Sequence, residues 1–195
     1  MNLKVSELID FLRRAKITTF ASDGQRSPSL RPYSKNYSFD DPPFHYEDQY
    51  FGEYVDVGQE IVWFNGIPVW GMGYRGGTHA WAYPNHVAIF EFLREALREP
   101  DPVIPIRGPT TLFRDPFFYT CLLNGSLLAF TGTETVYWNG KPAAFRSLVG
   151  GIIRGKHSVD MRIEEDVPLR FVGDQELEDL SEWHKFSANS ECGQT

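Results

Sequence analysis

The sequence is poor in cysteine and histidine, which excludes several kinds of catalytic or metal site. Its 195 residues include two cysteines, Cys121 and Cys192, too few for a disulfide framework or a cysteine-based metal cluster. The five histidines form no ligand pair at helical or strand spacing, and no serine stands in a nucleophile elbow. We therefore expect no metal, no cofactor and no conventional catalytic set.

Positive charge and long apolar runs are also scarce. The chain has 19 lysines and arginines against 26 aspartates and glutamates, which gives a net charge of -7. A duplex-binding protein needs a basic face, so nucleic acid is not an expected partner. No apolar run approaches the roughly 18 residues of a membrane helix, and charged residues interrupt the N-terminal segment where a signal peptide would have its apolar core. We expect a cytoplasmic protein that does not bind membranes.

What the sequence does contain is an internal repeat. The segment Gly58–Pro68 recurs as Gly132–Pro142, 74 residues later. Extended to the glycine pairs at 76–77 and 150–151, the two segments are identical at 8 of 20 positions, where unrelated sequences of ordinary composition would share about one. This similarity predicts a duplicated structural unit.

Each copy is predicted to begin with a helix. In the first helix Ser6 is a candidate N-cap, and the apolar stripe consists of Leu3, Val5, Leu8, Ile9, Leu12 and Ala15. The second helix is predicted to open at Pro84 or Asn85 and to stop before Pro100. Its apolar stripe consists of Val87, Ile89, Phe90, Leu93, Ala96 and Leu97.

The strands of each copy are predicted from alternation and turns. Asn65-Gly66 and Asn139-Gly140 each separate two β-rich runs, which is the strongest short hairpin pattern. The predicted fold is therefore α+β, with two copies of a helix plus an antiparallel β-meander related by a pseudo-twofold axis. Residues 1–157 are expected to form one duplicated domain, with repeat 1 at about 3–83 and repeat 2 at about 84–157.

The remaining residues, 158–195, form an acidic C-terminal extension without a counterpart in the repeat. They hold 10 acidic and 3 basic side chains, while residues 1–157 hold 16 of each. A strand-like run covers residues 167–172, and an amphipathic run includes Leu177, Leu180 and Trp183. We expect the extension to dock on the body; the alternatives are a protein-binding or a disordered extension.

The segment Gly71-Met-Gly73-Tyr-Arg-Gly76 matches the pattern of a dinucleotide-binding loop, but its context differs. That loop needs a parallel strand before it and a helix opening on it. Here a hairpin strand precedes, so a strand is the better interpretation. Gly71 and Gly73 would then mark where a ligand or a helix side chain approaches the backbone.

Aromatic residues are concentrated between positions 33 and 83. Aromatic walls with a few acids suit a small aromatic or cationic ligand, although they equally suit a core. The predicted ligand-binding residues are Arg31, Tyr50, Trp70, Tyr74, Arg75 and Trp81. Because the two copies differ most around position 70, a pocket is expected mainly in the first copy.

Asp48 and Glu60 are the alternative candidates for chemistry, as an acid pair across neighbouring strands. Glu60 recurs as Glu134, which favours a turn or ion-pair role over catalysis. The loop from residue 22 to 43 is long for a compact domain, and Arg26, Arg31, Tyr33 and Lys35 make it a candidate lid.

Four segments together resemble an uncharacterised bacterial domain family. These are Phe11–Ala15, Ser29–Pro32, Tyr46–Gly52 and Gly58–Met72, and the resemblance covers about residues 8–155. Members of that family are also similar to the C-terminal part of some XRE-type helix-turn-helix regulators. No DNA-binding helices precede the matching region here, so a direct regulatory role is not expected, and the resemblance implies no catalytic residues.

These observations favour a non-enzymatic domain that senses a small ligand or binds a partner. The first alternative is a small acid/base enzyme, hydrolase-like or isomerase-like, that uses Asp48 or Glu60. The second is a structural module for protein interaction, in which the acidic extension could contact a protein partner.

Overall fold

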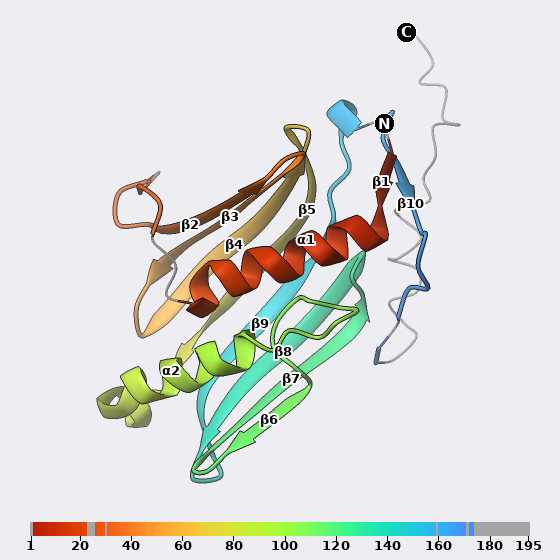
Figure 1. Ribbon diagram of the computed structural model, residues 1–195. Coiled ribbons are helices and arrows are strands. Elements are labelled where there is room, and N and C mark those ends of the chain that lie inside the picture. The colour runs from red at the N-terminus through yellow and green to blue at the C-terminus, as the bar shows by residue number, and fades with distance from the viewer. Residues whose placement is uncertain (1, 23–25, 30, 159, 171, 174–195) are drawn as a thin grey trace, which may run out of the picture.

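The computed structural model describes residues 2–22, 26–29, 31–158, 160–170 and 172–173. Within these residues, two α-helices and an eight-stranded antiparallel sheet place the chain in the α+β class, as the sequence predicts. Both helices lie on the same side of the sheet (Figure 1). No helix in the described part is long and apolar enough to cross a membrane.

The sheet consists of two meanders of four strands. The first comprises β2 (Lys35–Asp41), β3 (Phe44–Gly52), β4 (Val55–Phe64) and β5 (Ile67–Thr78). The second comprises β6 (Thr111–Arg114), β7 (Phe117–Ser126), β8 (Ala129–Trp138) and β9 (Lys141–Ile152). Strand β5 pairs antiparallel with β9, so the last strands of the two meanders meet at the centre, in the order β2-β3-β4-β5-β9-β8-β7-β6.

Both predicted Asn-Gly hairpin turns are confirmed. The φ angles are 50° at Asn65 and Asn139, 77° at Gly66 and 74° at Gly140. A type I′ turn requires positive φ at both central residues, which asparagine and glycine tolerate best. Each hairpin also has one register shift, again at positions 74 residues apart. The second meander therefore has the strand order and the hairpin turn of the first.

Helix α1 (Val5–Thr18) follows Lys4, its N-cap, so the predicted cap is wrong. Leu3 belongs to the short strand β1 (Asn2–Lys4), and Ser6 is not the N-cap. The Ser6 backbone amide donates to Oδ1 of Asp166 at 3.0 Å, and its hydroxyl donates to Oδ2. The Asp166 carboxylate thus accepts a hydrogen bond from a backbone amide in the first turn of α1. Such amides have no partner within the helix, and the helix dipole favours negative charge at this end.

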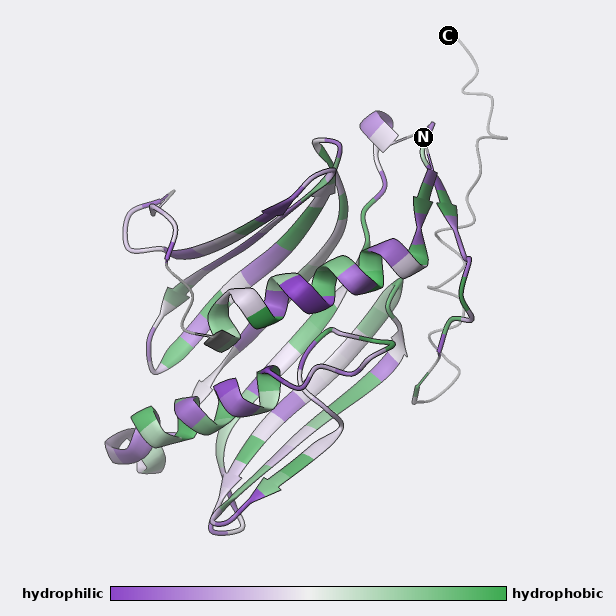
Figure 2. Cartoon of the chain, in the orientation of Figure 1, coloured by the Kyte–Doolittle hydropathy of each residue, from purple (hydrophilic) through white to green (hydrophobic). Residues whose placement is uncertain are grey.

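Helix α2 (His86–Leu97) has the predicted limits. It follows a 3-10 turn, η2 (Ala80–Asn85), and ends before Pro100. Ile89, Leu93 and Ala96 are buried, but Val87 is 56% exposed although it was predicted on the apolar stripe. Figure 2 shows hydrophobic and hydrophilic residues alternating around both helices, as expected for helices that cover one face of a sheet.

The core fills the space between the helices and the sheet face toward them, which we call the inner face. In β5, Trp70, Met72 and Tyr74 point to this face, which confirms the strand interpretation of the glycine motif. A Cβ on Gly71 would lie 2.9 Å from the Ile61 side chain. For a Cβ on Gly73, the nearest side chain would be that of Val149. The prediction that a helix side chain approaches these glycines is therefore wrong.

Part of the acidic extension contacts the body. Strand β10 (Arg162–Glu164) pairs in parallel with β1, and Figure 1 shows the two side by side. Val172 and Gly125 exchange two backbone hydrogen bonds of 2.8 and 2.9 Å. The strand predicted at 167–172 is wrong, because residues 167–170 form no strand and Val172 forms an isolated bridge. The run through Leu177, Leu180 and Trp183 lies outside the described residues.

Candidate functional site

Polar side chains lie on the inner face of both meanders, beneath the helices. Asp48 on β3 lies directly opposite Glu60 on β4, and Cys121 on β7 lies opposite Glu134 on β8. All four side chains are buried. Buried carboxylates need partners, and each glutamate has a different set of them.

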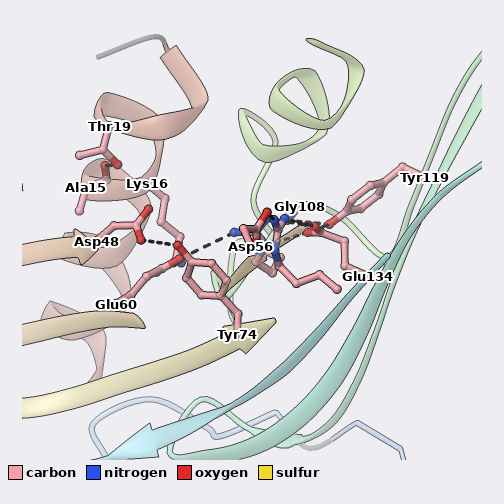
Figure 3. A network of polar contacts seen from close by, with 12 residues as sticks. Ala15, Lys16, Thr19, Asp48, Asp56, Glu60, Tyr74, Gly108, Tyr119 and Glu134 are labelled. Carbon is pink, nitrogen blue, oxygen red and sulfur yellow. Dashed lines mark hydrogen bonds and ion pairs between the residues drawn. The ribbon is translucent and has the colours of Figure 1, made fainter. Parts of the chain in front are cut away.

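A chain of ion pairs links the two glutamates. Lys16 of α1 pairs with Oε2 of Glu60, whose other oxygen lies 3.7 Å from Arg107 Nη1. Arg107, from the loop after α2, binds Glu134 with two hydrogen bonds of 2.7 and 3.0 Å. Figure 3 shows Lys16 and Glu60 at one end of this network and Glu134 at the other. Arg107 therefore joins the two meanders through their equivalent carboxylates.

The network continues along β9 to the first meander. Nη1 of Arg146 lies 3.3 Å from Oε1 of Glu134, and its Nη2 lies 2.6 Å from Oδ2 of Asp56 on β4. The Tyr119 hydroxyl donates to Glu134 at 3.1 Å. Although burial alone would raise the pKa of Glu134, Arg107 and then Arg146 hold it below its usual value. Glu134 is therefore ionised at neutral pH and structural in character.

Asp48 is the exception among these carboxylates. It accepts a hydrogen bond of 2.6 Å from the Tyr74 hydroxyl but makes no ion pair with any described residue. Burial, and then the charge of Glu60, raise the pKa of Asp48 from its ordinary 3.8 to about 7. The carboxyl thus exchanges its proton near neutral pH.

Asp48 borders a cavity of about 220 Å³ that lies between the first meander and helix α2. Its lining residues are Phe20, Arg26, Lys35, Tyr37, Asp48, Tyr50, Gly52, Glu53, Asp56, Tyr74, His86, Val87, Phe90, Arg94, Arg107 and Arg146. The rings of Tyr37 and Tyr50 stack at 6.5 Å with an 11° interplanar angle, and Phe20 meets both edge-on. The cavity therefore combines an aromatic wall with charged groups.

The second meander has different side chains at the equivalent positions. By strand register, Cys121 takes the place of Asp48, and Leu123 that of Tyr50. Burial raises the pKa of the Cys121 thiol to about 12, so it is unreactive at neutral pH. The titratable carboxyl and the aromatic wall thus belong to the first meander alone, the half in which the sequence predicts a pocket.

The predicted site residues are divided by the structure. Tyr50, Tyr74 and Asp48 line the cavity, whereas Glu60 is not among its lining residues and pairs with Lys16 in the ion-pair network. Arg26 and Lys35, both predicted in a lid loop, also line it. The prediction of a single loop from residue 22 to 43 is wrong, because Lys35–Asp41 form strand β2.

Trp70 does not line this cavity. Its side chain is fully buried, stacks on Phe130 at 5.9 Å and donates its indole NH to the Leu127 carbonyl at 2.9 Å. It is a core residue at the junction of the two meanders. Its counterpart in the second meander by strand register is Ala144.

Three other predicted residues lie on the surface. Trp81 is 38% exposed, stacks on Trp138 at 5.8 Å and has Lys141 Nζ 4.1 Å from its ring centroid. Arg75 is exposed on the outer face of β5, and Arg31 borders a hollow outside the sheet with Trp63. None of the three is among the residues that line the cavity.

The sequence analysis missed Arg107 and Arg146, which complete the site. One pattern could have indicated them: a glutamate at the same place in both copies, on the buried side of a strand, requires buried cations. No group of three or more His, Cys, Asp or Glu side chains in the described part is placed to hold a metal ion.

Residues 48–153 match the model of a family described as a domain of unknown function, DUF5680. The chain belongs to the DUF5680 family. The matched region begins at Asp48 and includes Glu60, Arg107, Glu134 and Arg146, so the whole central part of the buried network lies within the family domain. Comparison with curated proteins and with solved structures gave no match.

Proposed function

We propose that this DUF5680 chain is a ligand-sensing domain that binds a small molecule between its first meander and α2. The cavity beside Asp48 is the observation that supports this proposal best. Binding sites typically combine apolar walls with a few well-placed polar groups, and here Tyr37, Tyr50 and Phe90 supply the first and Asp48 the second. A bound molecule would contact strands of one meander and a helix that also packs on the other.

That position supports a sensing role. Phe92 of α2 stacks on Phe117 of the second meander at 5.1 Å, while Phe90 borders the cavity. A ligand in contact with Phe90 would therefore stabilise one position of α2 relative to the second meander. Binding would then shift the equilibrium between alternative positions of this helix. The shared strand order and hairpin turns support our inference that the two meanders descend from one duplicated unit, in which the aromatic wall and the titratable carboxyl belong to the first copy.

The test is a screen of metabolites by thermal shift, followed by the variant Tyr50→Leu. A ligand at 100 times its Kd should stabilise the protein by about 2.7 kcal/mol. Leucine occupies the equivalent position of the second meander, so the variant should fold. We expect it to weaken binding about tenfold to a hundredfold through loss of the aromatic wall.

The matched control is Trp81→Leu, which removes an exposed aromatic ring outside the cavity. It should leave the affinity unchanged. Undiminished affinity in a folded Tyr50→Leu protein would place the ligand elsewhere and contradict the proposal.

A second candidate function is acid/base catalysis by Asp48. It is favoured by a single observation, the pKa of about 7 in a carboxyl that borders a cavity and bonds to Tyr74. Conversion of a bound molecule by the wild-type protein, and its loss in Asp48→Asn with binding retained, would support this function over sensing alone.

A further inference from the structure

The charges that line the cavity are opposite in sign to those of the whole protein. The chain carries a net charge of -7, but the lining has five basic side chains against three acidic ones. The basic residues are Arg26, Lys35, Arg94, Arg107 and Arg146. A local excess of positive charge in an acidic protein attracts anions to that place.

Four of the five basic residues fall into two groups, and the fifth, Arg94, lies on helix α2. Arg107 and Arg146 lie deep, where Glu134 and Asp56 already neutralise them. Arg26 and Lys35 lie at the aromatic wall, where Arg26 bonds to the Tyr37 side chain and Lys35 Nζ lies 5.6 Å from the Tyr50 ring centroid.

The pairing of Lys35 is easily exchanged. Its carboxylate partner Glu53, at 3.2 Å, has a side chain that is 75% exposed. Exposed ion pairs contribute little to stability. A ligand carboxylate could therefore replace Glu53 as the partner of the Lys35 ammonium with little loss of free energy.

The acidic residues of the lining offer little to a cation. Asp56 is bound to Arg146 at 2.6 Å, and Asp48 accepts the hydrogen bond of Tyr74. Since the pKa of Asp48 is about 7, this carboxyl is partly neutral at physiological pH. The third acidic side chain, Glu53, is paired with Lys35 at 3.2 Å, so a cationic ligand would face Arg26 and would have to compete with Lys35 for Glu53.

We propose that the ligand is a small planar aromatic carboxylate, with its ring among Tyr37, Tyr50 and Phe90 and its carboxylate at Arg26 and Lys35. This inference rests on the proposed function, because it names the ligand class of the same cavity. The volume of about 220 Å³ is below the roughly 300–1,000 Å³ of pockets for drug-sized ligands, so a molecule of one or two rings fits.

The experiment compares matched compounds that differ only in charge. Benzoate and indole-3-acetate are the anions, benzamide and indole-3-acetamide the neutral analogues, and benzylamine and tryptamine the cations. Affinities are measured by calorimetry on the full chain at low and at moderate salt. We expect the better anion to bind at least tenfold more tightly than its amide, and the cations to bind more weakly still. Salt should weaken the anions alone, because exposed charges are screened.

The double variant Arg26→Gln with Lys35→Gln tests the residues. Both are at the surface end of the cavity, so folding should be unaffected, as checked by circular dichroism. We expect the anions to lose about tenfold in affinity and the amides to be unchanged. Arg75→Gln, which removes an exposed arginine from the opposite face of the sheet, is the matched control and should change nothing.

The outcomes separate this inference from the proposed function. Amides or amines that bind as tightly as the acids, and that lose affinity in Tyr50→Leu, would overturn the anion class and leave the ligand-binding function intact. Acids that bind equally to the double variant would also overturn it. Failure of all six compounds at millimolar concentration would overturn the aromatic-carboxylate class, while the metabolite screen would still decide the function.

Discussion

At the scale of residues, the inner face contains carboxylates with opposite electrostatic behaviour. Glu134 is held by Arg107 and Arg146, whereas Asp48 forms no ion pair within the described part of the chain, accepts a hydrogen bond from Tyr74 and lies opposite the charge of Glu60. A buried group with a raised pKa binds its proton more tightly in the folded protein than in the unfolded chain. Asp48 is therefore expected to make stability depend on pH in a predictable direction.

The substitution Asp48→Asn tests this directly. In the wild-type protein the contribution of Asp48 is fully present below pH 4 and is lost as the pH rises to about 7, the pKa of the folded state. Asparagine cannot ionise and can still accept the bond from Tyr74. We expect the variant to match the wild type near pH 5 and to exceed it by on the order of 2 kcal/mol at pH 8, measured by urea unfolding.

The control for this prediction is Glu134→Gln. Because the pKa of Glu134 is lowered, its ionisation falls outside this pH range, and the variant should be less stable at every pH from 5 to 8. The loss is expected at about 3–5 kcal/mol, since Arg107 would lose its partner in a buried pair. A difference between Asp48→Asn and the wild type that stays constant with pH would contradict the assignment of the proton to Asp48.

At the scale of elements, the two Asn-Gly hairpins have nearly the same backbone conformation in both halves. Gly66 and Gly140 have nearly the same φ, and a Cβ at either position would meet no atom within 4 Å. A substitution there tests backbone conformation alone, without steric clash.

We expect Gly66→Ala and Gly140→Ala to destabilise the protein by about 1 kcal/mol each, because alanine resists positive φ. Gly155→Ala is the matched control: its Cβ would also lie in open space, but Gly155 has no positive φ. That variant should be as stable as the wild type or slightly more so. Costs that differ severalfold between the two turns, in thermal melts, would show that the hairpins are not equivalent.

At the scale of the whole molecule, the described part of the C-terminal segment, residues 160–170 and 172–173, contacts the folded body. It supplies β10 beside β1, the Asp166 carboxylate to the start of α1, and Met161 to the core. The chain ends of the domain are thus held together by contacts that the repeat does not contain.

Truncation after Lys156 should therefore lower the thermal midpoint. Loss of the buried Met161 and of the β1–β10 pairing should cost about 2–3 kcal/mol, which corresponds to about 4–12 °C for a chain of this length. Truncation after Gly173 keeps every described contact of the segment and should melt like the full chain. A shorter variant with an unchanged midpoint would show that residues 157–173 are dispensable for folding.

The sequence by itself determined the α+β class, the limits of α2 and both hairpins. These features depend on local physics: helical periodicity, a proline stop, and the tolerance of Asn-Gly for positive φ. It also named Tyr50, Tyr74 and Asp48, which the structure places around the cavity, from the concentration of aromatic residues between positions 33 and 83 and from the acid pair of Asp48 with Glu60.

Only the tertiary structure decided what those residues contact. Arg107 meets Glu134 across 27 positions of the chain, and Arg146 meets Asp56 across 90. Both contacts depend on the pairing of β5 with β9 and on the path of the loop after α2, neither of which leaves a local pattern in the sequence. The same pairing buries Trp70 at the junction of the meanders, while its neighbour Tyr74, four residues along the same strand face, reaches the cavity.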